Sequence, residues 1–307
     1  MYFLSMNFIF GAHMSIANGF TDALKRSHEE MTANAMQIFM KSPRGRAITK
    51  LTPQEAGEFK AYAKKIDFKF VVAHCSYLLN FAKPVVDLSF ADAKQLIGEA
   101  PRSASLSSRC WALASLIDDL RGVEMLGGAG VVLHVGKSLE LSQADAFDFL
   151  IKNLKKILVE TEDIGAKIIL ENTAGQGTEM GRSFEELAEI YDSLGQSKKI
   201  GFCLDTCHSW AWGYDWSNAD AVLKDFDRVL GLKNLTLIHF NDAMKERGSR
   251  VDRHANLGDG CIGEKSLCAI AKFAAEHSIP LILETPENKG KTHIDDFNFV
   301  RSHCHSR

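Results

Sequence analysis

Six short apolar runs along the chain each end in a histidine or an acidic residue. The runs are three or four residues long and rich in Val, Ile and Leu. Runs of this kind are typical of strands buried on both faces of a parallel sheet. The runs and their final residues are Val71–Ala73 with His74, Val131–Leu133 with His134, Ile168–Leu170 with Glu171, Gly201–Leu204 with Asp205, Leu235–Ile238 with His239, and Leu281–Leu283 with Glu284.

Helical segments separate these strands, and two more strands are expected before them, at Phe8–Met14 and Ala35–Met40. Helices are expected at Ile16–Glu30, Pro53–Lys65, Trp111–Leu126, Gln143–Ile164, Ser183–Leu194, Ala219–Leu230, Glu264–His277 and Ile294–Ser302. Strands that alternate with helices predict parallel β-α-β units. Eight such units predict an α/β chain that closes into a TIM (β/α)8 barrel. We expect one domain, residues 1–307, with its active site at the C-terminal ends of the strands.

One long segment, residues 81–110, interrupts this alternation. It contains two prolines and the Ser-rich stretch Ser103–Ser108. We interpret it as an elaborated loop after the third strand, with a short helix around Phe90–Ile97.

Composition and charge restrict the possible functions. Of the 307 residues, 46% are hydrophobic and 24% charged, as in globular proteins with a large core. The net charge is −3, so a polyanionic partner would need a local basic patch. Seven cysteines without a CxxC pair favour reduced thiols. The short apolar N-terminus does not resemble a signal peptide, and no run reaches membrane-spanning length. We expect a cytoplasmic monomer.

The residues at the strand ends indicate a metal site. A buried carboxylate must be paired, protonated or bound to a metal, because an isolated one is energetically costly. Each strand-end residue alone could be an ordinary structural histidine or ion-pair partner. Gathered at one barrel mouth, however, the carboxylates would repel one another and so would the charged imidazoles, unless cations lie between them. His208 follows Asp205 by three residues, and Asp252 precedes His254 by two, which adds three more candidates.

All nine candidate ligands are histidines or carboxylates: His74, His134, Glu171, Asp205, His208, His239, Asp252, His254 and Glu284. Catalytic zinc sites mix these ligand types, whereas closed structural sites usually include thiolates. Nine ligands are too many for one ion, so we expect two or three. Clustered divalent ions indicate phosphoryl transfer or hydrolysis. Glu171 lies in the middle of the series and is the expected central catalytic residue.

Seven local motifs contain these residues: His74-Cys-Ser-Tyr77-Leu78, Leu133-His134-Val-Gly, Leu170-Glu171-Asn172-Thr-Ala-Gly-Gln-Gly, Leu204-Asp205-Thr-Cys-His208, His239-Phe-Asn241-Asp242, Gly248-Ser-Arg-Val-Asp252-Arg-His254 and Leu283-Glu284-Thr285. Together they resemble the endonuclease IV family, the deoxyribonuclease IV enzymes that cut DNA at apurinic/apyrimidinic sites. The resemblance extends from about Phe8 to Phe299. Two features depart from the family: Val135 replaces the usual proline, and residues 81–110 form a longer segment than usual.

The resemblance implies a TIM barrel with a site for three zinc ions. One ion would be held by His74, His134 and Glu171, a second by Glu171, Asp205, His239 and Glu284, and a third by His208, Asp252 and His254. Hydroxide formed from zinc-activated water would attack the phosphorus on the 5′ side of the damaged nucleotide. The product would be a 3′-hydroxyl, as base excision repair requires.

The resemblance also implies a surface that binds double-stranded DNA containing abasic sites. Arg44, Tyr77 and Leu78 would enter the minor groove and fill the gap left by the extruded nucleotide. Phosphate contacts are expected from Lys41, Arg44, Arg46, Lys245, Arg247, Arg250 and Arg253. The residues expected to orient the ligands, unless they cap loops, are Asn172, Asn241 and Asp242. His13, also at a strand end, would support the site.

Two other functions would use some of the same features. A sugar isomerase or epimerase could use a similar barrel with one or two ions, but it would need neither a third ion nor basic loops. A non-catalytic binder of damaged DNA would need the basic loops but not the complete ligand set.

Overall fold

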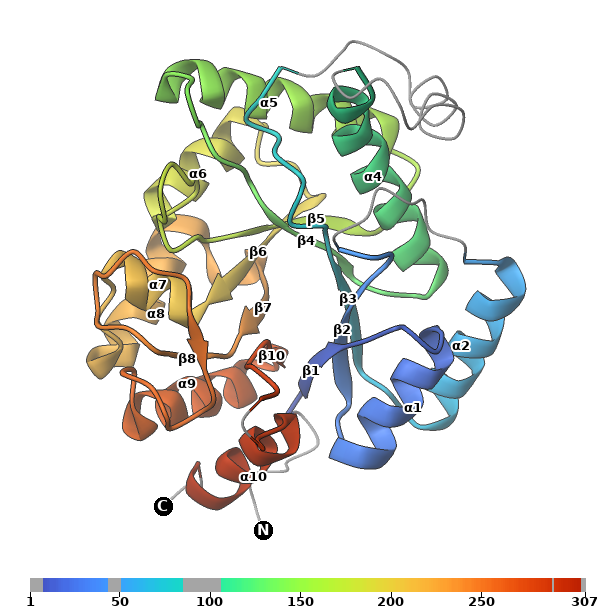
Figure 1. The fold of residues 1–307 in the computed structure, drawn as a ribbon, viewed down its shortest axis with the longest axis vertical. Helices are drawn as coiled ribbons and strands as arrows, with labels where there is room; N and C mark the ends of the chain where they lie inside the picture. Colours follow the sequence, from blue (N-terminus) through green and yellow to red (C-terminus); the bar gives the residue numbers. More distant parts are fainter. Residues whose placement is uncertain (1–7, 44–50, 85–105, 289, 305–307) are drawn as a thin grey trace.

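Eight parallel strands close into a barrel at the centre of the molecule (Figure 1). This computed structural model describes residues 8–43, 51–84, 106–288 and 290–304. Around the barrel the strands follow the order β1-β10-β7-β6-β5-β4-β3-β2. Their bounds are β1 Phe10–Met14, β2 Ala35–Phe39, β3 Phe70–His74, β4 Gly130–His134, β5 Lys167–Glu171, β6 Ile200–Asp205, β7 Leu235–His239 and β10 Leu281–Leu283. The predicted TIM barrel is confirmed.

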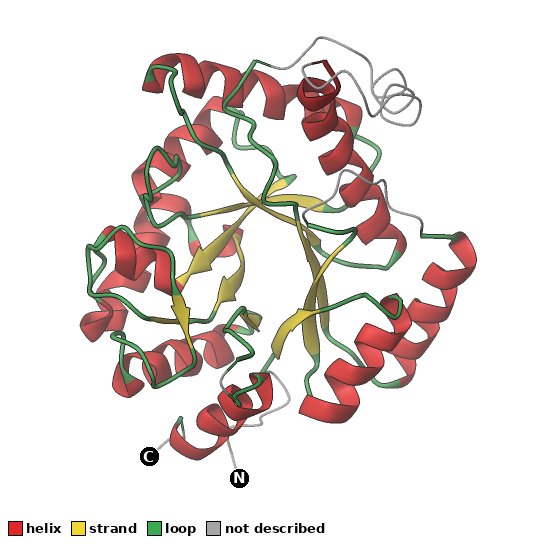
Figure 2. Ribbon diagram, viewed as in Figure 1, coloured by secondary structure: helices red, strands yellow, loops and turns green. Residues whose placement is uncertain are grey.

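Helices surround the barrel (Figure 2). They are α1 Phe20–Met31, α2 Pro53–Lys65, α4 Leu106–Met125, α5 Gln143–Glu160, α6 Phe184–Ser193, α7 Thr206–Trp212, α8 Ala219–Leu230, α9 Glu264–His277 and α10 His293–His303. The short strands β8 Asp242–Ala243 and β9 His254–Ala255 pair antiparallel beyond the barrel. No helix in the described part of the chain is both long and apolar enough to span a membrane.

Local sequence signals explain where some helices begin. The helix α2 starts where predicted, because the Thr52 hydroxyl accepts a hydrogen bond from the Glu55 N–H at 3.2 Å and the Glu55 carboxylate accepts one from the Thr52 N–H at 2.8 Å. The helix α1 starts four residues later than predicted. Gly19 precedes it with a φ of 100°, a conformation that favours glycine. The helix α4 begins at Leu106, inside the predicted long loop. The helix expected around Phe90–Ile97 lies outside the described residues.

Two successive layers of side chains fill the inside of the barrel. The lower layer is an apolar cluster of Ala35, Val72, Val132, Ile169, Cys203, Leu237 and Ile282. Residues two positions apart on a strand point to the same face. On each of these seven strands the next inward residue is therefore the one two positions further on, and all of these are polar: Gln37, His74, His134, Glu171, Asp205, His239 and Glu284. We call these seven residues the polar ring. It lies at the C-terminal mouth of the barrel.

The expectation of reduced cysteines is wrong for one pair. Cys268 on α9 and Cys304, just after α10, form a disulfide. They are 36 residues apart and meet because α10 packs against α9. Cysteine spacing does not reveal such a contact, because it arises only when the two helices dock. Cys75, Cys203, Cys207 and Cys261 are free thiols.

Candidate metal centre

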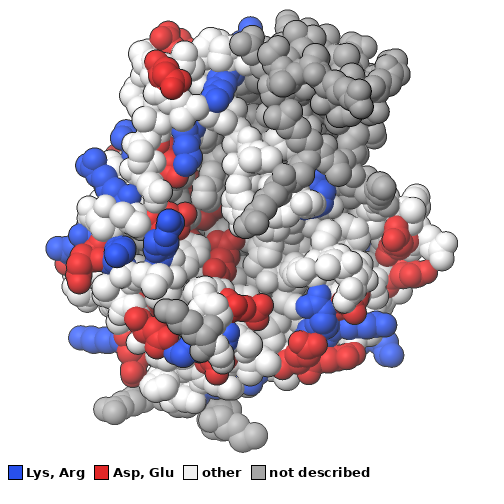
Figure 3. Space-filling view, viewed as in Figure 1, with Lys and Arg blue, Asp and Glu red and all other residues white. Residues whose placement is uncertain are grey.

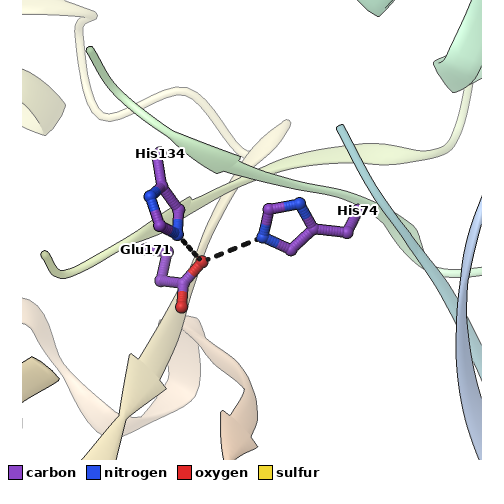
Figure 4. A group of neighbouring side chains, drawn as sticks. All are labelled: His74, His134 and Glu171. Atoms are coloured by element: carbon purple, nitrogen blue, oxygen red, sulfur yellow. Dashed lines mark hydrogen bonds and ion pairs between the residues drawn. The ribbon is translucent and has the colours of Figure 1, made fainter. Parts of the chain in front are cut away.

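The polar ring is centred on Glu171, whose side chain is fully buried. Its Oε2 atom lies 3.2 Å from His74 Nε2 and 2.9 Å from His134 Nε2 (Figure 4). Its Oε1 atom lies 2.8 Å from His239 Nδ1 and 3.4 Å from His208 Nδ1. The two oxygens therefore face two different sets of imidazole nitrogens. A carboxylate in this position is suited to bridge two cations.

A second group of ligand-type atoms surrounds the Oε1 side of Glu171. Within this group, His239 Nδ1 lies 3.2 Å from Glu284 Oε2 and 3.8 Å from Asp205 Oδ2. One ligand atom from each of Glu171, Asp205, His239 and Glu284 lies within 4.8 Å of the others. Three carboxylates and one imidazole so close together, and largely out of water, require positive charge to offset their repulsion.

A third group extends from Asp205 toward the surface. The Oδ1 atom of Asp252 lies 3.3 Å from His208 Nε2 and 3.5 Å from His254 Nε2. Asp205 Oδ2 also lies 3.6 Å from His254 Nε2, so this carboxylate stands between the second and third groups. The His254 Nε2 atom is buried and has no hydrogen-bond partner among the described residues. An unsatisfied buried nitrogen facing two carboxylates is the position expected of a metal ligand.

The imidazoles also determine the charge of the acids. Burial alone would raise the pKa of Glu171, but His239 and His134 hold that pKa well below its ordinary value. Burial likewise opposes ionisation of Asp252, yet His208 lowers the pKa of this group. Both acids are therefore present as carboxylates and can accept a cation without first losing a proton.

Two asparagines hold the candidate ligand Asp205 in place. Asn172 Oδ1 accepts a hydrogen bond from the Asp205 N–H at 2.8 Å. Asn241 Nδ2 donates to Asp205 Oδ2 at 2.9 Å, and Asn241 Oδ1 accepts from the Glu284 N–H at 2.8 Å. Both asparagines therefore contact predicted ligands directly and fix their orientation.

Asp242 has different contacts. Its carboxylate accepts hydrogen bonds from the backbone N–H groups of Ala243, Gly258, Gly260 and Ile262, at 2.8 to 3.1 Å. These bonds hold the segment after β9 in place, which is the loop-cap alternative that the sequence left open.

Sequence reasoning missed Gln37, a member of the polar ring. Gln37 is fully buried on β2, and its amide lies within hydrogen-bond distance of His239, Glu284 and His13. The signal was present in the sequence. Gln37 is the one strongly polar residue in the apolar stretch Ala35–Met40, two positions after Ala35. Gln37 was not predicted because it lies inside its strand and glutamine is not a typical metal ligand. His13 lies beside the ring, with Nδ1 3.0 Å from Gln37 Nε2 and 3.9 Å from Glu284 Oε1, and its supporting role stays a prediction.

Tyr77 and Leu78 lie at the rim of the centre. Their exposed fractions are 66% and 53%, high values for large apolar side chains. The Tyr77 ring centroid lies 5.3 Å from that of Phe39 and 6.0 Å from that of His74. Tyr77 also lines the open cavity of about 1000 Å³ above the candidate metal centre, together with His74, Asp252 and other residues. Leu78, its neighbour, is exposed in the same loop.

The structure contradicts the prediction that Lys41 contacts phosphate. Lys41 is buried, and its Nζ atom lies 2.8 Å from Asp119 Oδ1 and 3.5 Å from Asp118 Oδ2 of α4. The two carboxylates neutralise the charge of Lys41 inside the protein. The same ion pairs hold the start of the loop after β2 against α4. Arg44 and Arg46 lie outside the described residues. The remaining predicted contacts, all at least partly exposed, are Lys245, Arg247, Arg250 and Arg253.

Known proteins share this arrangement. Residues 28–303 match the family described as Xylose isomerase-like TIM barrel, so the chain belongs to that class of barrels. The crystal structure of endonuclease IV from Thermus thermophilus is similar, with a TM-score of 0.75 and 31% identity, covering 95% of this chain and 96% of that one. A relative named Probable endonuclease 4 from Nitrosopumilus maritimus is 37% identical, covering 95% of this chain and 97% of the relative. A relative of the same name from Chloroflexus aurantiacus is 32% identical, covering 94% of both chains. Within the class, the chain belongs to the endonuclease IV family.

For other barrels of the class, the similarity shows the fold alone. A D-tagatose 3-epimerase-like protein, for example, has a TM-score of 0.63 at 18% identity. Similarity at this level says nothing about the reaction.

Proposed function

We propose that this chain is a zinc-dependent DNA-repair endonuclease with a single domain, residues 1–307. It would cleave the phosphodiester bond on the 5′ side of an abasic site in duplex DNA and leave a 3′-hydroxyl. The main support is the position of Glu171, whose two buried oxygens face two separate groups of ligand-type atoms. Membership of the endonuclease IV family and the names of the relatives agree with this function.

The nine candidate ligands fit a site for several zinc ions. Five are imidazoles and four are carboxylates, the mixture found in catalytic zinc sites. His254 Nε2 supports the same conclusion, because it is buried without a hydrogen bond in the described part of the chain and faces two carboxylates. We assign one ion to His74, His134 and Glu171, a second to Glu171, Asp205, His239 and Glu284, and a third to His208, Asp252 and His254.

Bound zinc would supply Lewis-acid chemistry, both lowering the pKa of the attacking water and offsetting negative charge on the leaving 3′ oxygen. The protein side chains fix the geometry. Glu171 sets the spacing of two groups because it belongs to both. Asn241 holds the ligands Asp205 and Glu284 at fixed positions relative to each other. The cavity above them, at about 1000 Å³, has room for an extruded nucleotide.

The rim supports a DNA substrate. Tyr77 and Leu78 expose apolar surface beside the cavity, where they would fill the gap that an extruded abasic nucleotide leaves in the base stack. Figure 3 shows acidic side chains at the bottom of the central hollow and basic side chains on the side nearest α6 and α7. Basic residues beside the hollow would bind phosphates despite the negative net charge of the protein.

A sugar isomerase is the main alternative on this fold. It would use one or two ions and bind a small polar molecule. The third group, formed by His208, Asp252 and His254, would then have no use. Exposed apolar side chains such as Tyr77 and Leu78 would likewise have no partner. Both features favour the nuclease.

Incision of a defined duplex tests the proposal. The substrate is an end-labelled duplex with one tetrahydrofuran abasic analogue, and the control is the same duplex without it. We expect a single cut on the 5′ side of the analogue, with a product end that a DNA polymerase extends. A chelator should abolish the cut and added zinc should restore it. No incision by zinc-loaded protein, or equal incision of the intact duplex, would contradict the proposal.

A further inference from the structure

Gln37 uses both ends of its buried amide within the polar ring. The Nε2 atom lies 2.6 Å from Glu284 Oε1 and 3.0 Å from His13 Nδ1. The Oε1 atom lies 2.8 Å from His239 Nε2. The amide nitrogen thus has two acceptors for its two hydrogens, and the amide oxygen has one partner.

The contact with Glu284 fixes which way the amide points. An ionised carboxylate only accepts hydrogen bonds, so the NH₂ group of Gln37 must face Glu284 Oε1. The reversed amide would place two oxygens 2.6 Å apart. With the NH₂ group on this side, the amide oxygen faces His239. The Nε2 atom of His239 must then carry a hydrogen and donate it to Gln37.

This hydrogen bond leaves the lone pair of a neutral His239 on the other ring nitrogen. His239 Nδ1 lies 2.8 Å from Glu171 Oε1 and 3.2 Å from Glu284 Oε2, where the second group of ligands converges. A histidine binds metal through its unprotonated nitrogen, and the hydrogen bond made by the other nitrogen sets which one that is. The same amide also holds Glu284 through Oε1, while Oε2 faces His239 Nδ1.

We infer that Gln37 is a positioning residue for the second metal ion. It selects the tautomer of His239 and orients Glu284, although it is not a ligand itself. The inference rests on the proposed metal function of the second group. It singles out that group, because the described contacts of the Gln37 amide reach His239 and Glu284 but neither His74 and His134 nor His208 and His254.

The test is the zinc content of Gln37→Met, which keeps the length of the side chain but loses the amide. Gln143→Met, on the outer helix α5, is the matched control. After dialysis against a weak chelator, we expect about three zinc ions per chain in wild type and control, and about two in Gln37→Met. The affinity of the lost site should fall roughly 10- to 100-fold. Long-range ¹H–¹⁵N spectra of histidine-labelled protein should show a changed tautomer signal from His239.

A second variant guards against a simple packing defect. Gln37→Glu keeps an oxygen toward His239 but places a negative charge against Glu284, so it should lose the same ion. Unchanged zinc content and affinity in both variants would overturn the inference. Equal weakening of all three sites would also overturn it, because the effect would then not be directed to the second ion. A wild-type protein with a single ion would instead contradict the metal proposal itself.

Discussion

The floor and the rim of the site are built in different ways. The floor is the polar ring, whose members lie on barrel strands or, for Glu284, directly after one, and are mostly buried. The rim consists of loop residues such as Tyr77, Leu78 and Arg253, which are exposed. The strands hold the side chains of the polar ring in position before any ligand binds, whereas the loops of the rim expose their side chains to a binding partner. We therefore expect the floor to determine chemistry and the rim to determine which DNA is bound.

The largest expected effect of a substitution is on the floor, with Glu171→Gln. The amide keeps the shape but loses the charge shared by two ligand groups. Cleavage of abasic DNA should fall roughly 10²-fold or more, as when one preorganised electrostatic group is removed. Binding of abasic duplex should change much less, because the rim is intact.

The matched control for this variant is Glu55→Gln in the α2 capping box, where Gln also serves. The measurements are single-turnover cleavage and equilibrium binding. Cleavage by Glu171→Gln at a rate near that of wild type would show that the floor does not act through this carboxylate.

A smaller effect is expected on the rim, with Tyr77→Ala combined with Leu78→Ala. Zinc content and folding should not change, because neither side chain is a ligand and exposed substitutions alter stability little. Preference for abasic over intact duplex should fall, by about 1–3 kcal/mol per stacked group lost. The measurement is the ratio of the two dissociation constants.

Val159→Ala provides the matched control for the rim variant, since Val159 is an exposed apolar residue on the outer helix α5, with an exposed fraction of 69%. If the rim variant and this control keep the same ratio as wild type, damage is recognised elsewhere, and Arg44 becomes the next residue to test.

The smallest effect is expected when one of two arginines over the same aromatic ring is replaced, and the two replacements should differ in their effect on DNA binding. The guanidinium carbons of Arg250 and Arg182 lie 4.9 and 5.1 Å from the Trp212 ring centroid. Arg182 is also paired with Glu186, with Nε 2.8 Å from Oε1, whereas Arg250 has no acidic partner in the described part of the chain. The slope of the logarithm of the DNA-binding constant against the logarithm of salt concentration should therefore become shallower by about one in Arg250→Gln, as for the loss of one phosphate contact. In Arg182→Gln this slope should change less. Equal slopes for wild type and Arg250→Gln would show that Arg250 does not contact a phosphate.

The same contrast explains what the sequence could predict. His74, His134, Glu171 and Asp205 were found because each ends an apolar strand, and strand periodicity then brings them to one layer. Gln37 obeys the same periodicity but was missed, because it sits inside a strand and is not a metal ligand type.

Tertiary contacts account for the predictions that failed. Lys41 looked like part of a basic loop, yet Asp118 and Asp119 are about 80 residues further along the chain and meet it only after α4 docks. The disulfide between Cys268 and Cys304 has the same origin. Residues at strand ends can be located from the local pattern of hydrophobic residues. Contacts between elements that are distant in the sequence are seen only in the folded structure.

Metal content tests the central claim most directly, namely that one buried carboxylate joins two of three metal sites. Zinc should be measured by elemental analysis in purified protein, after removal of loosely bound metal and alongside Glu171→Gln. We predict about three zinc ions per wild-type chain, as three ligand groups require, and fewer in the variant because two sites lose a charged ligand. A fully active wild-type protein with a single tightly bound ion would contradict the account.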